Sequence, residues 1–177
     1  MSRKLLLLIL FGMLSILKAQ ISMGQQLEEG DARAMIQANF IYQFAINSNW
    51  PAEVKKGKFQ IVVVGNENVF KHMAEKYGTK PIGAQAIEVV NASAWSAGQF
   101  AQIIFVDKSK KSELQKIIKE GKSKSMLVVT NWEGALTAGA CINFKNVENS
   151  IRYEMNELSM SERKITPGNK LLQWKVQ

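Results

Sequence analysis

The hydrophobic pattern of the chain centres on one uninterrupted apolar stretch. Residues 59–65 read FQIVVVG, so four consecutive β-branched residues follow Gln60 and lead to Gly65. A strand with one face in water would alternate polar and apolar side chains, whereas an unbroken run is typical of a strand covered on both faces. The stretch therefore predicts a central strand of a parallel sheet.

Further strand patterns follow, and helical patterns separate them. The predicted strands are Ala86–Val90, Gln102–Asp107 and Ser125–Thr130. The predicted helices are Glu67–Tyr77, closed by Gly78, and Lys110–Glu120, which Ser109 would cap and Gly121 would stop. Strands that alternate with helices of about eleven residues indicate βαβ units with right-handed crossovers.

A long helix is predicted ahead of the first strand. It spans Ala32–Asn49, begins at Asp31 as N-cap after a loose lead-in over Gln25–Gly30, and ends at Trp50-Pro51 because proline disfavours helical geometry in the residue before it. The row expected to face the sheet is Ile36, Phe40 and Phe44. Such an apolar helix is expected to pack on the sheet.

The pattern changes near the C-terminus. Ala140–Phe144 and Ser150–Asn156 are predicted as two strands joined by a five-residue turn, and the second alternates apolar and polar side chains. Short helices are expected at Glu157–Glu162 and Leu171–Trp174. The predicted fold class is α/β, a three-layer sandwich with a mostly parallel central sheet and an antiparallel C-terminal edge hairpin.

The first residues have the layout of a secretory signal peptide. Ser2-Arg3-Lys4 is positively charged, Leu5–Leu17 is apolar, and Ala19 offers a small residue for cleavage. The apolar run is shorter than the ~20 residues of a membrane-spanning helix, although an uncleaved signal anchor is the alternative. We expect a signal peptide over residues 1–22, one domain over residues 31–177, a periplasmic product and no permanent membrane span.

The charge balance changes this picture little. The chain has 23 basic and 15 acidic residues, and its net charge of +8 falls to +5 without the three cations of the first twenty residues. A solvated lysine surface explains this bias, with an acidic partner or an anionic membrane surface as the alternative. Export makes nucleic acid a poor candidate partner. Cys141 is the only cysteine, so no intramolecular disulfide can form.

No catalytic motif is apparent. The residues after Gly65 lack the G-x-G-x-x-G fingerprint of dinucleotide sites, and one histidine (His72) with one cysteine is too few for a zinc site. His72 has no serine or cysteine nearby in sequence to activate. We therefore expect no enzyme, no cofactor and no metal. A hydrolase would have to use His72 or an acid at a strand end, namely Glu67, Asp107 or Glu133.

Six residues are candidates for binding a partner or ligand. Three tryptophans fall in predicted loops or at helix ends, where they either pack at the rim of the core or form a recognition surface. Two polar residues end predicted strands, where ligands bind in open α/β sheets. With one tyrosine of the first helix, the set is Tyr42, Trp50, Trp95, Trp132, Asn66 and Asp107.

Several short motifs in order resemble the YfiR-like family of exported bacterial proteins. The family's first helix typically ends Tyr-x-Phe-Ala-x-Phe-x-x-Trp-Pro. The matching residues are Tyr42, Phe44, Ala45, Trp50 and Pro51, with Asn47 in place of the second Phe, followed by Ile142-Asn143-Phe144, Arg152–Asn156 and Leu171-Leu172. The similarity covers roughly residues 32–174.

The resemblance implies a periplasmic, non-enzymatic regulator. Its partner would be the periplasmic part of a membrane diguanylate cyclase or sensor kinase, and a homodimer is left open. The best-known member restrains a cyclase and carries cysteine pairs, so redox sensing by a disulfide is not expected of a chain with Cys141 alone. The alternative function is a periplasmic small-molecule-binding module that uses the strand-end crevice near Asn66, Asp107 and Trp132.

Overall fold

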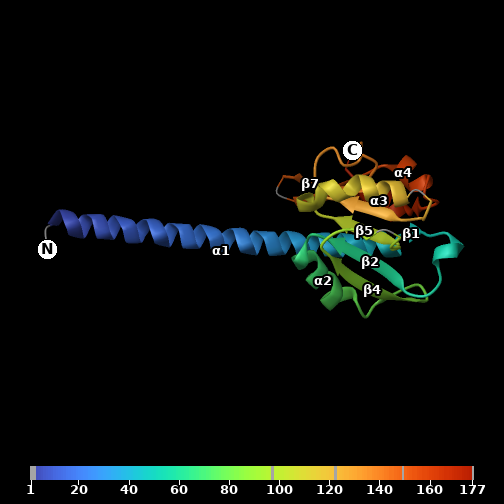
Figure 1. The fold of residues 1–177 in the computed structure, drawn as a ribbon, viewed down its shortest axis with the longest axis horizontal. Helices are drawn as coiled ribbons and strands as arrows, with labels where there is room; N and C mark the ends of the chain where they lie inside the picture. The colour runs from blue at the N-terminus through green and yellow to red at the C-terminus, as the bar shows by residue number, and fades with distance from the viewer. Residues whose placement is uncertain (1–2, 97, 122, 149, 177) are drawn as a thin grey trace. The chain divides into compact units, whose positions relative to one another are not determined.

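A computed structural model describes residues 3–96, 98–121, 123–148 and 150–176, and of residues 3–23 it describes the backbone alone (Figure 1). The chain divides into two units, Met1–Arg33 and Ala34–Gln177. Residues 1–2 of the predicted signal peptide lie outside the described residues, as do the side chains of the rest, so its cleavage stays a prediction. Among the described helices, none has the length and hydropathy of a membrane span.

The first unit is helical and belongs to α1 (Arg3–Ile46). The predicted loose lead-in over Gln25–Gly30 and the N-cap at Asp31 are therefore wrong. Gly24 and Gly30 weaken a helix by only about 1 kcal/mol each, and no proline interrupts the segment. An ion pair between Glu29 and Arg33, with an N–O distance of 2.6 Å, supports helical geometry at i, i+4 spacing.

The second unit is built on a seven-stranded sheet, and the strand predictions are confirmed. Five parallel strands form its centre, and one antiparallel strand lies at each edge, so the C-terminal hairpin is where it was expected. In spatial order the strands are β3 (Pro81–Ile82), β4 (Gln85–Ala92), β2 (Phe59–Val64), β5 (Ile103–Val106), β6 (Leu127–Thr130), β7 (Ile142–Val147) and β8 (Ser150–Met155). A separate two-stranded sheet pairs β1 (Ser48–Asn49) with β9 (Thr166–Pro167).

Helices cover both faces of the seven-stranded sheet. The β2-to-β4 connection through α2 (Glu67–Tyr77) and the β5-to-β6 connection through α3 (Leu114–Gly121) run in opposite directions, so right-handed crossovers place the two helices on opposite faces. Tyr42 of α1 stacks on Tyr77 of α2, so residues 34–46 of α1 share the face of α2. The short helices are η1 (Ala52–Val54), η2 (Lys108–Glu113), α4 (Glu157–Ser161) and α5 (Asn169–Trp174).

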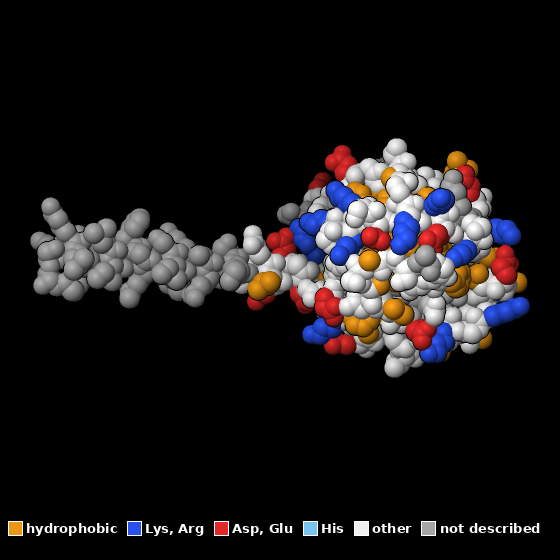
Figure 2. All heavy atoms as spheres, in the orientation of Figure 1, with side chains coloured by type: hydrophobic (Ala, Val, Ile, Leu, Met, Phe, Trp, Pro, Cys, Tyr) orange, Lys and Arg blue, Asp and Glu red, His pale blue; other side chains and the backbone are white. Residues whose placement is uncertain are grey.

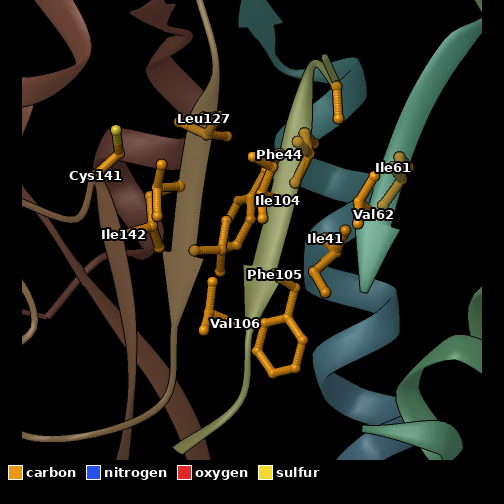
Figure 3. Close-up of a cluster of buried hydrophobic side chains, with 14 of the residues drawn as sticks. Ile41, Phe44, Ile61, Val62, Ile104, Phe105, Val106, Leu127, Cys141 and Ile142 are labelled. Atoms are coloured by element: carbon orange, nitrogen blue, oxygen red, sulfur yellow. The ribbon is translucent and has the colours of Figure 1, made fainter. Parts of the chain in front are cut away.

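One part of the core lies between α1 and the sheet, and another includes Leu114, Ile117 and Ile118 of α3. Figure 3 shows Ile41 and Phe44 of α1 beside the apolar side chains of neighbouring strands. Phe44 is fully buried, and its ring lies 5.9 Å from Phe144 and 4.8 Å from Tyr153, between ring centroids. Burial raises the pKa of Tyr153 to about 12, and its hydroxyl donates to the Leu171 carbonyl at 2.8 Å.

The predicted inward row of α1 is confirmed for Phe40 and Phe44, which pack in the core, and is wrong for Ile36. Ile36 is 37% exposed, whereas the buried row consists of Ala34, Ala38, Ile41 and Ala45, with Phe44 beside it. Hydrophobic spacing of three and four residues fits both rows.

The element boundaries also differ in places. Asp107, rather than Ser109, is the cap: its carboxylate accepts from the Ser109 backbone N–H at 2.9 Å, and a 3-10 helix precedes α3. Gly78 ends α2 with a right-handed φ of −58° instead of the left-handed conformation expected of a glycine stop. β7 extends to Val147, so the hairpin turn is shorter than five residues.

Charged side chains are dispersed over the visible face. Figure 2 shows lysine and arginine side chains interspersed with acidic ones. Several form exposed pairs, such as Lys58 with Glu88 at 2.7 Å. This distribution fits the solvated lysine surface that the composition favoured.

Candidate functional site

The six predicted binding residues lie in three places. Tyr42 and Trp50 lie on or next to the last turns of α1. Asn66, Asp107 and Trp132 lie where β2, β5 and β6 end, and Trp95 is in the loop between β4 and β5.

The exposed side of α1 carries one row of side chains that we call the outer row. It consists of Met35, Asn39, Tyr42 and Ile46, which are spaced four, three and four residues apart and so share one helix face. Met35 is 45% exposed and Ile46 is 43% exposed, and both are large apolar side chains. These two side chains therefore leave apolar area accessible for contact on this face of the helix.

Tyr42 is held rigidly within this row. Its ring stacks on Tyr77 with centroids 4.4 Å apart and planes at 15°, and the Tyr77 hydroxyl donates to Asn39 Oδ1 at 2.9 Å. Lys80 Nζ lies 5.1 Å from the Tyr77 centroid and 5.7 Å from that of Tyr42, within the range of cation–π attraction. The outer row therefore includes one ring of a stacked tyrosine pair, and the positive charge of Lys80 lies next to that pair.

Trp50 lies at the end of the outer row, beneath the surface. It is buried, its indole Nε1 donates to the Ala45 carbonyl at 3.0 Å, and its ring meets Phe59 edge-on at 5.2 Å between centroids. It forms part of a hollow of about 290 Å³ that Ile46 and Ser48 also line. Ser48 Oγ is buried there without a hydrogen-bond partner. The outer row thus leads into an apolar hollow with one free polar atom.

At the strand ends, Asp107 organises a polar cluster. Its carboxylate accepts hydrogen bonds from Asn66 Nδ2 at 3.0 Å, Asn131 Nδ2 at 2.8 Å and the Ser109 N–H at 2.9 Å. Burial acts to raise the pKa of the Asp107 carboxyl, but the hydrogen bonds from Ser109, Asn131 and Asn66 outweigh it, and the pKa is lowered. The structure therefore brings Asn66 and Asp107 together around an ionised carboxylate.

Between the ends of β2 and β5, side chains of the protein itself lie against Gly65. This is the point where the strand order reverses, at which open α/β sheets bind ligands. Gly65, with φ of 84°, packs so closely that an added Cβ would lie 2.4 Å from Lys110 Cγ, and Ser109 Oγ donates to the Gly65 carbonyl at 3.2 Å. The side chains of η2 thus occupy the space next to Gly65.

Beside this cluster, a hollow of about 690 Å³ opens next to Trp132. Asn131, Asn143, Lys145 and Glu154 are among the residues that line it. Asn143 Oδ1 accepts from the Trp132 N–H at 3.0 Å, and Asn143 Nδ2 donates to Glu154 Oε1 at 2.9 Å. Lys145 Nζ lies 3.0 Å from Glu154 Oε2. Trp132 thus offers a half-buried ring beside fixed amide and carboxylate groups.

Trp95 is remote from these groups and is 2% exposed. Its indole Nε1 donates to a Glu120 carboxylate oxygen at 2.9 Å, and its carbonyl accepts from Lys116 Nζ at 2.9 Å. The hydrogen bond from Trp95 is the main cause that lowers the pKa of Glu120. These contacts attach the loop to α3 and leave little of the ring for a partner.

The cysteine and histidine do not meet as a reactive pair. Cys141 is buried, burial raises the pKa of its thiol, and Sγ lies 4.0 Å from the Ser159 carbonyl. His72 lies on α2, which covers one face of the sheet, whereas α3 covers the other. In the described part of the chain, no three His, Cys, Asp or Glu side chains are grouped to hold a metal ion.

Sequence reasoning missed two partners of these residues. Asn131 directly follows β6 and completes the Asp107 cluster, and Tyr77 supports Tyr42. The sequence did contain a signal for Asn131, because this asparagine directly follows the apolar strand β6. Asn66 has a similar position, just after β2 and Gly65. No comparable local signal connects Tyr77 to Tyr42, 35 positions earlier.

The fold and these surfaces define an α/β domain with an apolar helix face and polar strand ends. Residues 34–174 match the family model described as DUF4154, YfiR/HmsC-like. The chain therefore belongs to the YfiR/HmsC-like family, and the resemblance drawn from its motifs is confirmed. This is a regulatory, non-catalytic family of periplasmic proteins. A comparison with curated proteins gave no match.

Proposed function

We propose that this protein is a periplasmic regulator that binds the periplasmic part of a membrane diguanylate cyclase, with a sensor kinase as the other class of target, and changes its output. The observation that carries the proposal is the family match over residues 34–174. The regulator acts by contact, without chemistry of its own. A lowered or raised cyclic di-GMP level is then a consequence of protein–protein binding.

The outer row of α1 is the contact surface that the structure favours. Met35 and Ile46 expose large apolar side chains on one helix face, and between them Tyr42 is held by its stack on Tyr77. Rigid aromatic residues surrounded by apolar area are typical of binding hot spots. An amphipathic partner segment can cover the row and reach the hollow beside Trp50.

Ile46→Glu tests this surface. In a strain lacking the gene, we expect cyclic di-GMP to change several-fold, the wild-type gene to restore it, and Ile46→Glu to fail because a charge would be buried at the contact. The matched control is Leu158→Glu, since Leu158 is 71% exposed on α4, and it should restore the level. Secretion and the melting temperature are measured for each variant.

Co-purification from envelope extracts gives the second measurement. Wild type and Leu158→Glu should recover a membrane protein with a cyclase or kinase domain, and Ile46→Glu should not. Recovery of no such protein by the wild type, with no change of cyclic di-GMP in the deletion strain, would reject the proposal. Equal recovery by Ile46→Glu would reject the outer row as the contact surface.

A second candidate function, small-molecule binding, is favoured by the hollow beside Trp132. Its volume of about 690 Å³ suits a small metabolite, and Asn143 and Glu154 supply fixed polar groups. A ligand at 100 times its Kd should raise the melting temperature by about 5–10 °C, and Trp132→Ala should remove most of that rise. A metabolite screen in which the tryptophan variant responds as strongly as the wild type would contradict this assignment.

A further inference from the structure

Arg163, which follows α4, is a buried cation without a counter-ion. It is 2% exposed, and its guanidinium donates to the carbonyls of Ser159 at 2.6 Å and Gly139 at 3.3 Å. Within the described residues, Arg163 has no ion pair with a carboxylate, and its Nε–H is buried without an acceptor. Burying an uncompensated charge is strongly unfavourable. A donor and a positive charge are therefore both left for a group outside the chain.

A hollow adjoins this arginine. It measures about 300 Å³, and its polar lining includes Ser123, Lys124, Ser125 and Lys164 in addition to Arg163. A second hollow of about 290 Å³ also reaches Arg163, from the side of Gly139 and Ser159. Arg163 is therefore a lining residue of two hollows, although only 2% of the residue is exposed.

The backbone around the first hollow is held in an unusual conformation. Among described residues other than glycine, three have positive φ, and two of them are Ser125 with φ of 28° and Lys164 with φ of 58°. Such conformations are unfavourable for residues with a Cβ and tend to be retained at binding sites. Both residues line the same hollow as Arg163.

The charges of the hollow favour an anion. Three cations (Lys124, Arg163 and Lys164) face two carboxylates, Glu53 and Glu162. Glu53 pairs with Lys164 at 3.4 Å, but both side chains are more than half exposed, so this pair is weak and open to exchange. A guanidinium binds carboxylate or phosphate oxygens with two parallel hydrogen bonds, which suits the free Nε–H.

We propose that this hollow binds a small oxyanion, a carboxylate or a phosphate, with Arg163 as its buried anchor and Lys124 and Ser125 among its lining residues. The site lies at the amino end of β6, whereas the Asp107 cluster lies at the carboxyl end of the same strand. It is independent of the regulatory contact on α1. In an exported regulator, such a site would let a dissolved anion change the stability of the domain.

The test uses protein purified from cells that express the full chain, in a chloride buffer. Sodium phosphate and sodium succinate are titrated separately, with the melting temperature and the Arg163 Nε–H signal in nitrogen–proton NMR spectra as readouts. At 100 times Kd, the bound anion should raise the melting temperature by about 5–10 °C, and the Nε–H signal should shift with the same Kd.

Variants separate a site from a general salt effect. Lys124→Gln should weaken binding several-fold, and Glu162→Gln should strengthen it, because one removes an attractive charge and the other a repulsive one. Arg163→Lys should abolish the two-point contact, but it also changes a buried side chain on which folding depends, so Lys124→Gln is the deciding variant. The matched control is Lys119→Gln, an exposed lysine of α3, which should bind as the wild type does.

A response to phosphate alone or to succinate alone identifies which oxyanion the site takes, and both results support the proposal. Equal melting shifts in the wild type, Lys124→Gln and Glu162→Gln, without movement of the Arg163 signal, would show a general salt effect and overturn it. The absence of any response to either anion would overturn it as well.

Discussion

Replacing Phe44 with alanine is expected to lower the free energy of unfolding by about 3–5 kcal/mol. Phe44 is fully buried between α1 and the sheet, and its ring contacts those of Phe40, Phe144 and Tyr153. The substitution removes the transfer energy of the ring and leaves a cavity that neighbouring strands cannot close. It also removes edge-to-face packing on Tyr153, at 4.8 Å and 80°.

Urea unfolding followed by tryptophan fluorescence measures this loss. The matched control is Met35→Ala on the same helix, since Met35 is 45% exposed and should change stability by no more than about 0.5 kcal/mol. A loss below about 1 kcal/mol for Phe44→Ala would contradict the packing of α1 on the sheet. The slope with urea should stay the same, because neither change alters the surface that unfolding exposes.

Two of the central strands, β2 and β5, were predictable because each is covered on both faces. Ile61–Val64 and Ile103–Val106 contain no polar residue and end at Gly65 and Asp107, so sequence alone located both strands within a residue. The alternation in Ser150–Met155 likewise predicted an edge strand. Patterns of this kind involve only residues that are neighbours in the sequence, so they can be recognised without knowledge of the fold.

The register of α1 was not predictable in the same way. Ile36 and Ile41 are equally apolar, and both fit a helical row with Phe40 or Phe44, so the spacing alone does not tell that Ile41 is buried and that Ile36 is 37% exposed. The start of the helix failed for another reason: Gly30 weakens a helix, but it does not end one when flanking residues favour helix.

The candidate sites show the same difference between features that local patterns predict and features that depend on long-range packing. The meeting of Asn66 with Asp107 followed from the rule that parallel strands end at one edge of a sheet. The burial of Trp95 did not, because its indole is held by Glu120, 25 positions later, on a helix whose orientation no local pattern specifies. Arg163 gave no signal at all, since a buried arginine and a solvated one look alike in sequence.

Asp107→Asn is expected to lower the free energy of unfolding by about 2–3 kcal/mol at pH 7, because hydrogen bonds to an ionised acceptor are strong and the amide places donors against donors. Asn66, Asn131 and the Ser109 N–H all donate to the carboxylate, and a neutral amide can accept from only some of them. Glu133→Gln is the matched control, since Glu133 is an exposed acid just beyond β6. It should change stability by no more than about 0.5 kcal/mol.

The pH dependence of the stability difference between wild type and Asp107→Asn shows whether the charge of the Asp107 carboxylate, and not only its shape, stabilises the fold. The pKa of Asp107 is lowered in the folded protein, so its contribution is fully present above the unfolded value of about 3.9 and is lost as the pH falls through the lower folded value. The difference between wild type and Asp107→Asn should therefore be constant from pH 7 to about pH 5 and shrink below about pH 4. Unfolding curves at several pH values measure it. A difference that grows on acidification would mean that the carboxyl is protonated in the folded cluster, and the hydrogen bonds from Asn66 and Asn131 would then need another explanation.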